Sequence, residues 1–517
     1  MASTLCQIGQ RPGLRDGGNE IESGVPATPS FRPVLFNSYE FIFLFLPVIL
    51  VLWHLTARKV GANAGKFLLL LASLSFYGLG GPQFLPLLMG SMAFNFGFGR
   101  LVARESTAPG LRKLLLAFGL AVNLGVLGYF KYADFFVANA NAVFGTDWPL
   151  LRVVLPLGIS FYTFQKVGFL VDSYRGLTRG CSFADYCLFV SFFPQLVAGP
   201  IVHHSELIPQ FQRQENRGCD AGTLAQGVAL FTLGLAKKVL VADSLSAPVG
   251  HVFSAVAAGK ELSCGDAWLG LLLYAFQLYF DFSGYSDMAI GLGRMFGVRL
   301  PFNFNSPYAA SSPADFWRRW HITLSNFIRD YLYIPFGGSR GGMFRTCFNL
   351  ALVMTIAGLW HGARWTFVLW GAVHGLALVA NRLWRKQAGE KVRLPAWFGW
   401  LGTFVFVMLA WALFRAESLA AAGRLYAKLL DFGVGPGGPS LVKPRYWIYA
   451  ALLIAAMRWL PNSQQIVFRE RAEIPSPVWW LRPEWRPDSV WAAALAALFA
   501  ACVLSLSKAG EFLYWQF

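Results

Sequence analysis

The sequence predicts an all-α, polytopic integral membrane protein. Of its 517 residues, 56% are hydrophobic and only 14% are charged, and the mean hydropathy is +0.47. A typical soluble domain carries roughly a quarter charged residues, so this composition favours a chain that lies largely in lipid. Apolar runs recur along the chain, and a spanning helix needs about 20 predominantly apolar residues. We therefore expect roughly a dozen transmembrane helices.

The expected spans are separated by polar or glycine-containing segments. They are Phe41–Leu55, Phe67–Gly80, Leu85–Phe98, Leu114–Phe130, Val153–Leu170, Gly227–Val241, Trp268–Phe280, Leu350–Trp360, Trp365–Ala380, Phe398–Phe414, Ile448–Met457 and Val490–Leu506. Several runs are short, and non-helical backbone is tolerated at membrane depth only where protein or water surrounds it. We therefore predict short re-entrant or amphipathic core helices as well. The span count between residues 182 and 342 stays open.

The net charge of +17 is concentrated in the loops between these spans. The basic clusters are Arg58, Lys59 and Lys66; Arg100, Arg104, Arg112 and Lys113; Arg382, Arg385, Lys386, Lys391 and Arg393; and the loop from Arg458 to Arg486. Cytoplasmic loops are enriched in Lys and Arg, so we expect these loops in the cytoplasm and both termini outside. This distribution argues against a nucleic-acid partner and favours contact with membrane lipid.

The domain organisation follows from composition. Residues 1–35 are rich in Gly, Pro and Ser and lack the hydrophobic core of a signal peptide, so we predict a disordered tail there. Residues 36–517 are predicted to form one membrane domain, with a catalytic core at about 151–380. The seven cysteines are dispersed without metal-ligand spacing, so no metal site is expected.

His361 lies at a break between two apolar runs. The first run ends at Trp360, the His361-Gly362 pair follows, and an apolar course resumes over Trp365–Ala380. Ionisable residues inside membrane segments usually face a cavity, a partner or a substrate path. Imidazole titrates near neutral pH and can therefore take or give a proton. We predict acid–base chemistry at His361.

The most polar part of the core, residues 300–342, predicts one amphipathic helix. Ser312 and Asp315 resemble a capping box, Pro313 occupies the favoured first helical position, and Pro335 marks the end. Helical spacing divides the residues into two faces. The apolar stripe is Trp317, Trp320, Leu324, Phe327, Ile328 and Tyr331, and the polar face is Arg318, His321, Ser325 and Arg329. We expect this helix at an interface or in a cavity, with His321 facing inward.

Asp281 and Asp287 lie between apolar stretches, where an unpaired charge is heavily penalised. We expect partners for both carboxylates, and a structural ion pair is as reasonable as a catalytic role. The candidate partners are Arg294, Arg318 and Arg319. Gly291, Gly293 and Gly297 imitate a nucleotide-binding loop, but without a preceding parallel sheet they favour close helix packing.

Three motifs together resemble the membrane-bound O-acyltransferase family. They are Asp315–His321 (Asp-Phe-Trp-Arg-Arg-Trp-His), Asp330–Gly338 (Asp-Tyr-Leu-Tyr-Ile-Pro-Phe-Gly-Gly) and Gly358–Gly362 (Gly-Leu-Trp-His-Gly). Within that family the alginate O-acetyltransferase branch is the most similar. Segments Phe36–Pro47, Gly158–Gln165 and Phe192–Ile201 and the tail that ends at Phe517 add support, so the resemblance covers about residues 36–517.

The resemblance implies a bacterial inner-membrane enzyme that takes acetyl from cytoplasmic acetyl-CoA and passes it outward for O-acetylation of an exopolysaccharide, alginate first among them. It implies no permanently bound cofactor, and its partners would be periplasmic esterase-like (SGNH-type) acetyltransferases. His361 matches the family's catalytic histidine, and His321 matches a second functional position. Arg318 and Arg329 are candidates to meet the CoA phosphates. Ser325, Trp360 and Asp287 complete the predicted donor or substrate contacts.

Several alternatives stay open from the sequence. His361 can act as a base or accept the acetyl group itself. A relative in the same family would transfer D-alanine or another acyl group. Intramembrane Asp281 and Asp287 are also typical of a transporter or flippase, although the two halves of the chain show no repeat. His374 is interpreted as a helix-packing residue.

Overall fold

The computed structural model describes residues 35–212, 220–388, 395–432, 441–468 and 483–508, together with Gly510 and Leu513. These ranges contain helices and no β-strand, which confirms the all-α prediction. The predicted N-terminal tail, except for Leu35, lies outside the described residues, so its disorder stays a prediction.

Eight helical segments of the described chain are long and apolar enough to cross a membrane, judged by length and composition. They are Glu40–Lys59, Ala62–Gly80, Pro82–Ala103, Pro109–Phe144, Ala221–Ala257, Gly342–His361, Trp365–Gln387 and Ala396–Arg415. All twelve predicted runs fall on helices, but the run Val153–Leu170 becomes helical only at Ile159, after Gly158 adopts a left-handed conformation (φ 68°). The figure of a dozen spans stays a prediction.

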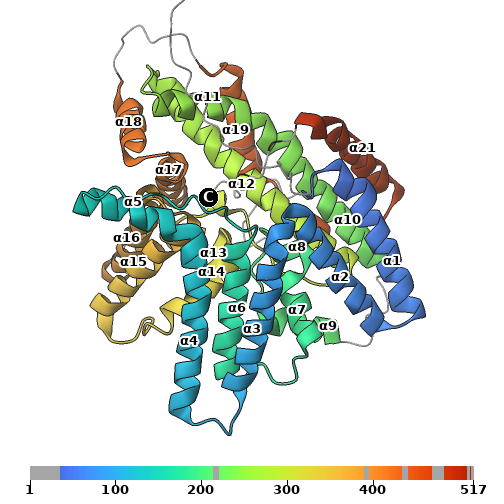
Figure 1. Ribbon diagram of the computed structural model, residues 1–517. Coiled ribbons are helices and arrows are strands. Elements are labelled where there is room, and N and C mark those ends of the chain that lie inside the picture. Colours follow the sequence, from blue (N-terminus) through green and yellow to red (C-terminus); the bar gives the residue numbers. More distant parts are fainter. Residues whose placement is uncertain are drawn as a thin grey trace, which may run out of the picture. The chain divides into compact units, whose positions relative to one another are not determined.

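The helices follow one another as labelled in Figure 1. The first half comprises α1 (Leu46–Lys59), α2 (Ala62–Gly80), α3 (Leu85–Ala103), α4 (Pro109–Leu127), α5 (Ala133–Phe144), α6 (Ile159–Tyr174), α7 (Phe183–Ser191), α8 (Phe193–Leu196), α9 (His204–Gln212), α10 (Ala221–Ala236), α11 (Ser246–Ala257) and α12 (Cys264–Met295). The second half comprises α13 (Pro313–Arg319), α14 (Ile322–Ile328), α15 (Gly342–His361), α16 (Trp365–Gln387), α17 (Ala396–Arg415), α18 (Leu419–Leu430), α19 (Arg445–Trp459), α20 (Ser463–Phe468) and α21 (Ser489–Ser505). Wide π-helical turns are η1 (Glu40–Phe45), η3 (Gly128–Tyr132), η4 (Lys237–Ala242) and η7 (Arg329–Tyr333).

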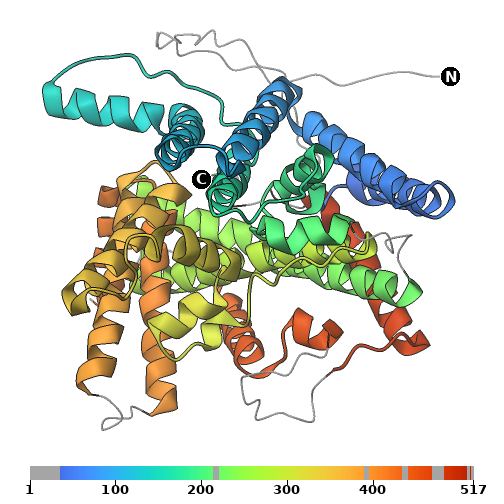
Figure 2. The same ribbon diagram turned by 90° about the horizontal axis from the view of Figure 1, so that it is seen from below.

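The 32-residue helix α12 forms the centre of the fold. It packs against α10, η4, α11, α17 and α18, and nearly all of its side chains are buried. In two perpendicular views the α12 ribbon crosses the middle of the drawing, between the blue N-terminal helices and the yellow-to-orange helices α15 to α17 (Figure 1, Figure 2). Of the predicted catalytic core, α8, α10, η4 and α11 lie against this central helix.

Glycines allow α10 and α12 to approach closely. A Cβ on Gly291 would lie 2.7 Å from the carbonyl oxygen of Gly227, and one on Gly284 would lie 2.7 Å from that of Gly234. The interpretation of Gly291 as a helix-packing glycine is confirmed. The small side chains fix the separation of the two helices and therefore the depth at which their polar residues meet.

The prediction of a single amphipathic helix from Ser312 onward is wrong at one point. The N-cap is as expected, because Ser312 Oγ accepts a hydrogen bond from the Asp315 amide at 3.2 Å. The helix breaks at His321, which has a left-handed backbone (φ 45°, ψ 54°) and separates α13 from α14. Residues distant in sequence impose the break, since the Ile322 amide donates to the carbonyl of Asn303 and the Asn305 amide to that of Arg319, both at 2.9 Å.

Candidate active site

The hairpin of α15 and α16 carries His361. The two helices touch through Gly358 and Gly371: a Cβ on Gly358 would lie 2.2 Å from the carbonyl oxygen of Phe367, and one on Gly371 would lie 2.3 Å from that of Met354. Only glycine permits this approach. His361 is the last residue of α15, one turn beyond Gly358, so this contact fixes its position against α16.

Aromatic rings enclose His361, whose exposed fraction is 4%. The ring centroids of Trp360, Trp370 and Phe414 lie 4.9, 5.2 and 5.3 Å from that of the imidazole. Lys131 Nζ donates a hydrogen bond to the His361 carbonyl at 3.2 Å, and the Trp370 ring contacts the rings of both His361 and His374. The predicted catalytic histidine therefore occupies a buried aromatic pocket.

His321 is held by a network of polar side chains. Its Nδ1 lies 2.9 Å from Asn303 Oδ1, which also accepts a hydrogen bond from Thr323 Oγ1 at 3.0 Å. Asn303 Nδ2 donates to Ser286 Oγ at 3.2 Å, so the amide oxygen faces His321. An amide oxygen only accepts hydrogen bonds, so Nδ1 carries the proton and Nε2 carries the lone pair. Complete burial lowers the pKa of His321 to about 3, which keeps the ring neutral at working pH.

An apolar cavity of about 360 Å³ lies between α13, α14, α15 and α16. Three of its lining residues, Arg318, Ser325 and Arg329, belong to the predicted polar face, and the structure brings them together there. His321 is not among the lining residues and lies behind the cavity wall. The cavity ends near Trp317, whose Nε1 donates a hydrogen bond to His374 Nδ1 at 3.3 Å.

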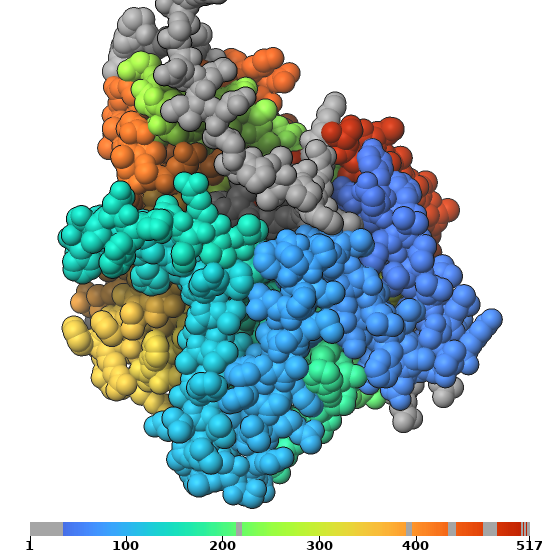
Figure 3. Space-filling view, viewed as in Figure 1, coloured from blue at the N-terminus to red at the C-terminus, as the bar shows by residue number. Residues whose placement is uncertain are grey.

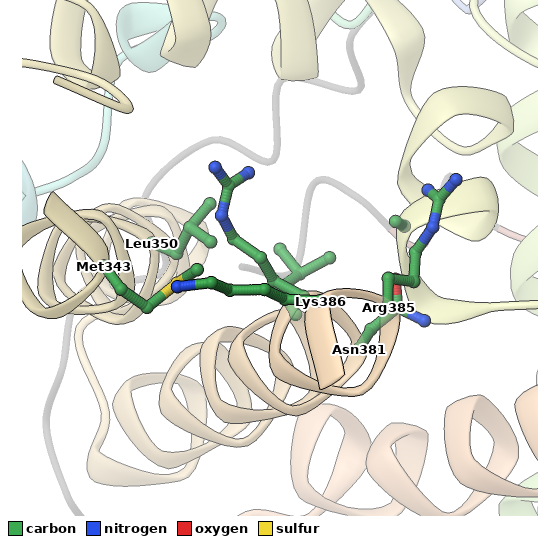
Figure 4. A pocket seen from close by; sticks show the side chains of 8 residues that line it. Met343, Leu350, Asn381, Arg385 and Lys386 are labelled. Atoms are coloured by element: carbon green, nitrogen blue, oxygen red, sulfur yellow. The ribbon is translucent and has the colours of Figure 1, made fainter. Parts of the chain in front are cut away.

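A second cavity, of about 550 Å³, adjoins the first, since Ala314, Leu350 and Leu378 line both. Its distinctive residues are Arg382, Arg385 and Lys386, at the C-terminal end of α16. In Figure 4, Lys386 extends across the pocket toward Met343, and Arg385 stands on the other side of the α16 ribbon. We call these three cations the basic mouth.

The two cavities follow α15 along its length. Met343 in the first turn lines the basic mouth, and Leu350, Val353 and Met354 line the apolar cavity. His361 lies at the far end of the same helix. At its inner end, Trp317 packs at 5.8 Å against Trp370, which in turn contacts His361. Helix α15 therefore lines both cavities and carries the buried imidazole of His361, which lines neither of them.

The remaining predicted site residues occupy different surroundings. Trp360 is buried and stacks at 4.9 Å on Phe164, so it supports His361 from outside the cavity. Arg329 lines the cavity and also forms an ion pair with Asp330 at 2.7 Å. Asp287 is not among the residues that line either cavity.

The two buried aspartates have partners, but not the predicted arginines. Lys237 Nζ lies 2.6 Å from Asp287, which also accepts a hydrogen bond from Ser463, and Lys238 Nζ lies 2.8 Å from Asp281. Both lysines belong to the π-helical turn η4. This turn places consecutive lysines against α12, and apolar periodicity did not indicate it.

Sequence reasoning missed two residues beside the histidines. Lys131 follows directly on the apolar run that ends at Phe130, and its position at a membrane segment was a usable signal. Asn303 stands among aromatic residues in a loop, where no local pattern indicates contact with His321. The residues of the basic mouth were used in the sequence analysis only to predict that their loop lies in the cytoplasm.

Fold and site together define a class: a helical membrane protein that holds a histidine in an aromatic pocket beyond an apolar cavity with a cationic entrance. The model of the membrane-bound O-acyltransferase family matches residues 170–421, which include both His321 and His361. The chain belongs to this family and is therefore a membrane-bound O-acyltransferase. The resemblance of its motifs to the family is confirmed.

The chain is also similar to individual proteins within and near this family's O-acetylating branches. A peptidoglycan O-acetyltransferase of Helicobacter pylori is 43% identical over 436 residues, which cover 79% of this chain and 81% of that protein. A probable alginate O-acetylase of Azotobacter vinelandii is 44% identical over 405 residues, with 77% and 79% covered. A teichoic acid D-alanyltransferase of Streptococcus thermophilus is 31% identical over 281 residues, with 50% and 68% covered.

Proposed function

We propose that this protein takes acetyl from acetyl-CoA on the cytoplasmic side of a bacterial inner membrane and passes it outward for O-acetylation of a polysaccharide. Relatives named for O-acetylation share 43 to 44% identity with the chain, which favours acetyl over D-alanyl as the transferred group. The observation that carries the proposal is the order along α15 of the basic mouth, the apolar cavity and, about two turns beyond the cavity-lining Met354, the buried His361.

The donor fits the chemistry of the two cavities. Acetyl-CoA carries phosphates at one end and an acetyl thioester at the end of a thin pantetheine arm. Arg382, Arg385 and Lys386 would meet the phosphates, and charge-assisted hydrogen bonds contribute about 1.5–3 kcal/mol each. The pantetheine arm would lie in the apolar cavity beside Ser325 and Arg318. This places the phosphates on residues other than the Arg318 and Arg329 that the sequence indicated.

His361 can support acetyl transfer in two ways. As a base, it takes the proton of an acceptor hydroxyl, whose oxygen forms the new bond to the acetyl carbon while the carbon–sulfur bond breaks and the CoA thiolate leaves. As a nucleophile, its ring nitrogen bonds to the acetyl carbon while the carbon–sulfur bond breaks and the CoA thiolate leaves. The acceptor oxygen then attacks that carbon, the carbon–nitrogen bond breaks, and the freed imidazole nitrogen takes the hydroxyl proton. His321, neutral and oriented by Asn303, would assist at the carbonyl or at His361.

The proposed orientation follows from charge. Lys and Arg are enriched on the cytoplasmic side of a membrane, so the basic mouth would face the cytoplasm and both termini would lie outside. His361, at the other end of α15, would then lie toward the outer half of the membrane. The acceptor side would then be served by periplasmic esterase-like acetyltransferases. Alginate is the first acceptor to test. Peptidoglycan is the second, because the Helicobacter pylori relative is equally similar.

The test uses purified protein in lipid nanodiscs with two donors, acetyl-CoA and acetyl-pantetheine, which lacks the nucleotide phosphates. We expect His361→Ala to abolish thioester turnover with both donors. Arg385→Ala combined with Lys386→Ala should raise the KM for acetyl-CoA at least tenfold and leave that for acetyl-pantetheine unchanged. The exposed Arg104 in the loop after α3, changed to Ala, is the matched control.

Two results would contradict the proposal. Undiminished turnover in His361→Ala would remove that residue from the chemistry, and equal effects of the double variant on both donors would remove the basic mouth from phosphate recognition. Supplying alginate or peptidoglycan with the periplasmic partner in separate reactions then identifies the acceptor.

A further inference from the structure

The end of α15 lacks the usual backbone closure of a helix. The last carbonyls of a helix have no intrahelical partner, and a left-handed residue after the helix often satisfies them. Here Gly362 leaves α15 in an extended conformation (φ −164°, ψ 150°). The carbonyls of the turn that carries His361 must therefore be satisfied by side chains from elsewhere in the fold.

Two consecutive residues of the π-helical turn η3 supply these donors. Tyr132 OH donates to the carbonyl of Leu359 at 3.0 Å. Lys131 Nζ donates to the carbonyl of Trp360 at 2.6 Å and to that of His361 at 3.2 Å. The η3 turn and α5 follow directly on α4, and Figure 3 shows the teal α5 segment at the surface near gold atoms of α15. The π-helix is rare, and it appears mostly as a single turn within α-helices, frequently at functional sites.

The third hydrogen of the Lys131 ammonium goes to Ser160 Oγ at 3.2 Å. Ser160 lies in the first turn of α6, which also supplies Phe161 and Phe164 against the ring of Trp360. An ammonium has three donors, and here all three are used. Lys131 thus joins three segments of chain at the residue that carries the imidazole.

We propose that Lys131 is a positioning residue for acyl transfer, which holds the backbone of His361 by binding the carbonyls of the last turn of α15. The inference rests on the proposed role of His361. The positive charge also complements the negative end of the α15 dipole, and the Trp360 ring lies 5.7 Å from the ammonium. Lys131 touches neither cavity, so it acts through His361 and not through the donor.

The position of a catalytic group must hold within about 0.5 Å, which sets the expected result. Lys131→Met keeps the length of the side chain and removes the donors. We expect its kcat to fall at least tenfold while the KM for acetyl-CoA stays within twofold, because the basic mouth is untouched. Lys131→Arg, which can donate to the same carbonyls, should recover part of the loss. The exposed Lys113 of α4, changed to Met, is the matched control and should behave as the wild type.

The readout separates positioning from a general loss of structure. If Lys131→Met does not purify as a folded protein, Lys131→Gln, which keeps a donor without the charge, takes its place. A folded variant with wild-type kcat, or one whose KM rises as much as its kcat falls, would overturn the inference. His361→Ala runs in the same assay: turnover in that variant defeats the proposed function, whereas an inactive His361→Ala beside a fully active Lys131→Met defeats only the role of Lys131.

Discussion

Replacing Gly358 by alanine should displace the helix that carries His361. The new Cβ would lie 2.2 Å from the carbonyl oxygen of Phe367 and 2.9 Å from the backbone of Gly371. Ordinary contact begins near 3.4 Å, so going from 2.2 to 3.4 Å requires the helices to part by about 1.2 Å. The obstructing atoms are backbone and cannot rotate away.

The expected magnitude has two parts. Overpacking costs about 1–3 kcal/mol, and the upper end applies because backbone must move. Alanine regains about 1 kcal/mol in helix propensity, which leaves a net destabilisation of about 2 kcal/mol. Since a misplacement of about 1 Å can lower a rate by about a hundredfold, turnover should fall further than stability alone implies.

The assay pairs thermal unfolding in detergent with acetyl-CoA turnover. Gly90→Ala in α3 is the matched control, because its Cβ meets nothing within 4 Å; it should melt at or slightly above the wild-type temperature with full turnover. If Gly358→Ala melted and turned over like Gly90→Ala, the reasoning that the glycine contact sets the place of His361 would be refuted.

Three further predictions concern buried polar groups. Asn303→Leu removes the Asn303 acceptor from His321 Nδ1. We expect the free energy of unfolding to fall by about 1–3 kcal/mol and kcat to fall as well, because the ring loses the contact that orients it; a wild-type kcat would dismiss the orienting role of Asn303. Lys237→Met removes the ammonium that pairs with the buried Asp287 carboxylate, and it should lower the free energy of unfolding by about 3–5 kcal/mol. The double variant Lys237→Met/Asp287→Leu removes both charges and should recover much of this loss. If the wild type and both variants melted at the same temperature, the ion pair would not contribute to stability. Because burial lowers the pKa of His321 to about 3, its neutral form stabilises the fold above pH 6.5 and this contribution is lost as pH falls toward 3. The wild type should therefore lose melting temperature faster than His321→Asn between pH 6.5 and about pH 4.5, and parallel curves would count against this linkage.

Much of the fold was predictable because apolar runs report directly on helices. The break after His361 was visible for the same reason: a titratable residue and a glycine interrupt two such runs. The break at His321 was not visible, because the periodicity of residues 312–331 continues through it. Pairing with residues 303–305 imposes the left-handed turn, and such non-local contacts leave no trace in local spacing.

The same limit explains the errors in partner assignment. Asp287 and Asp281 were matched to arginines because those are near in sequence, whereas the lysines of η4 reach them through the close contact of α10 and α12. The basic mouth was visible as charge but not as a cavity wall, since only folding brings the end of α16 beside the start of α15.

The paired lysines and aspartates also constrain how the protein is made. Each of these four charges, entering a bilayer alone, opposes insertion by about 2.5–3.5 kcal/mol. Lys237 and Lys238 are synthesised before Asp281 and Asp287, with α11 between them. Lys238 pairs within its own segment with Asp243 at 2.6 Å, whereas Lys237 has Asp287 of α12 as its carboxylate partner. Packing of α12 against α10 therefore brings a partner to Lys237 and a second one to Lys238, which lowers the cost of holding both charges at membrane depth.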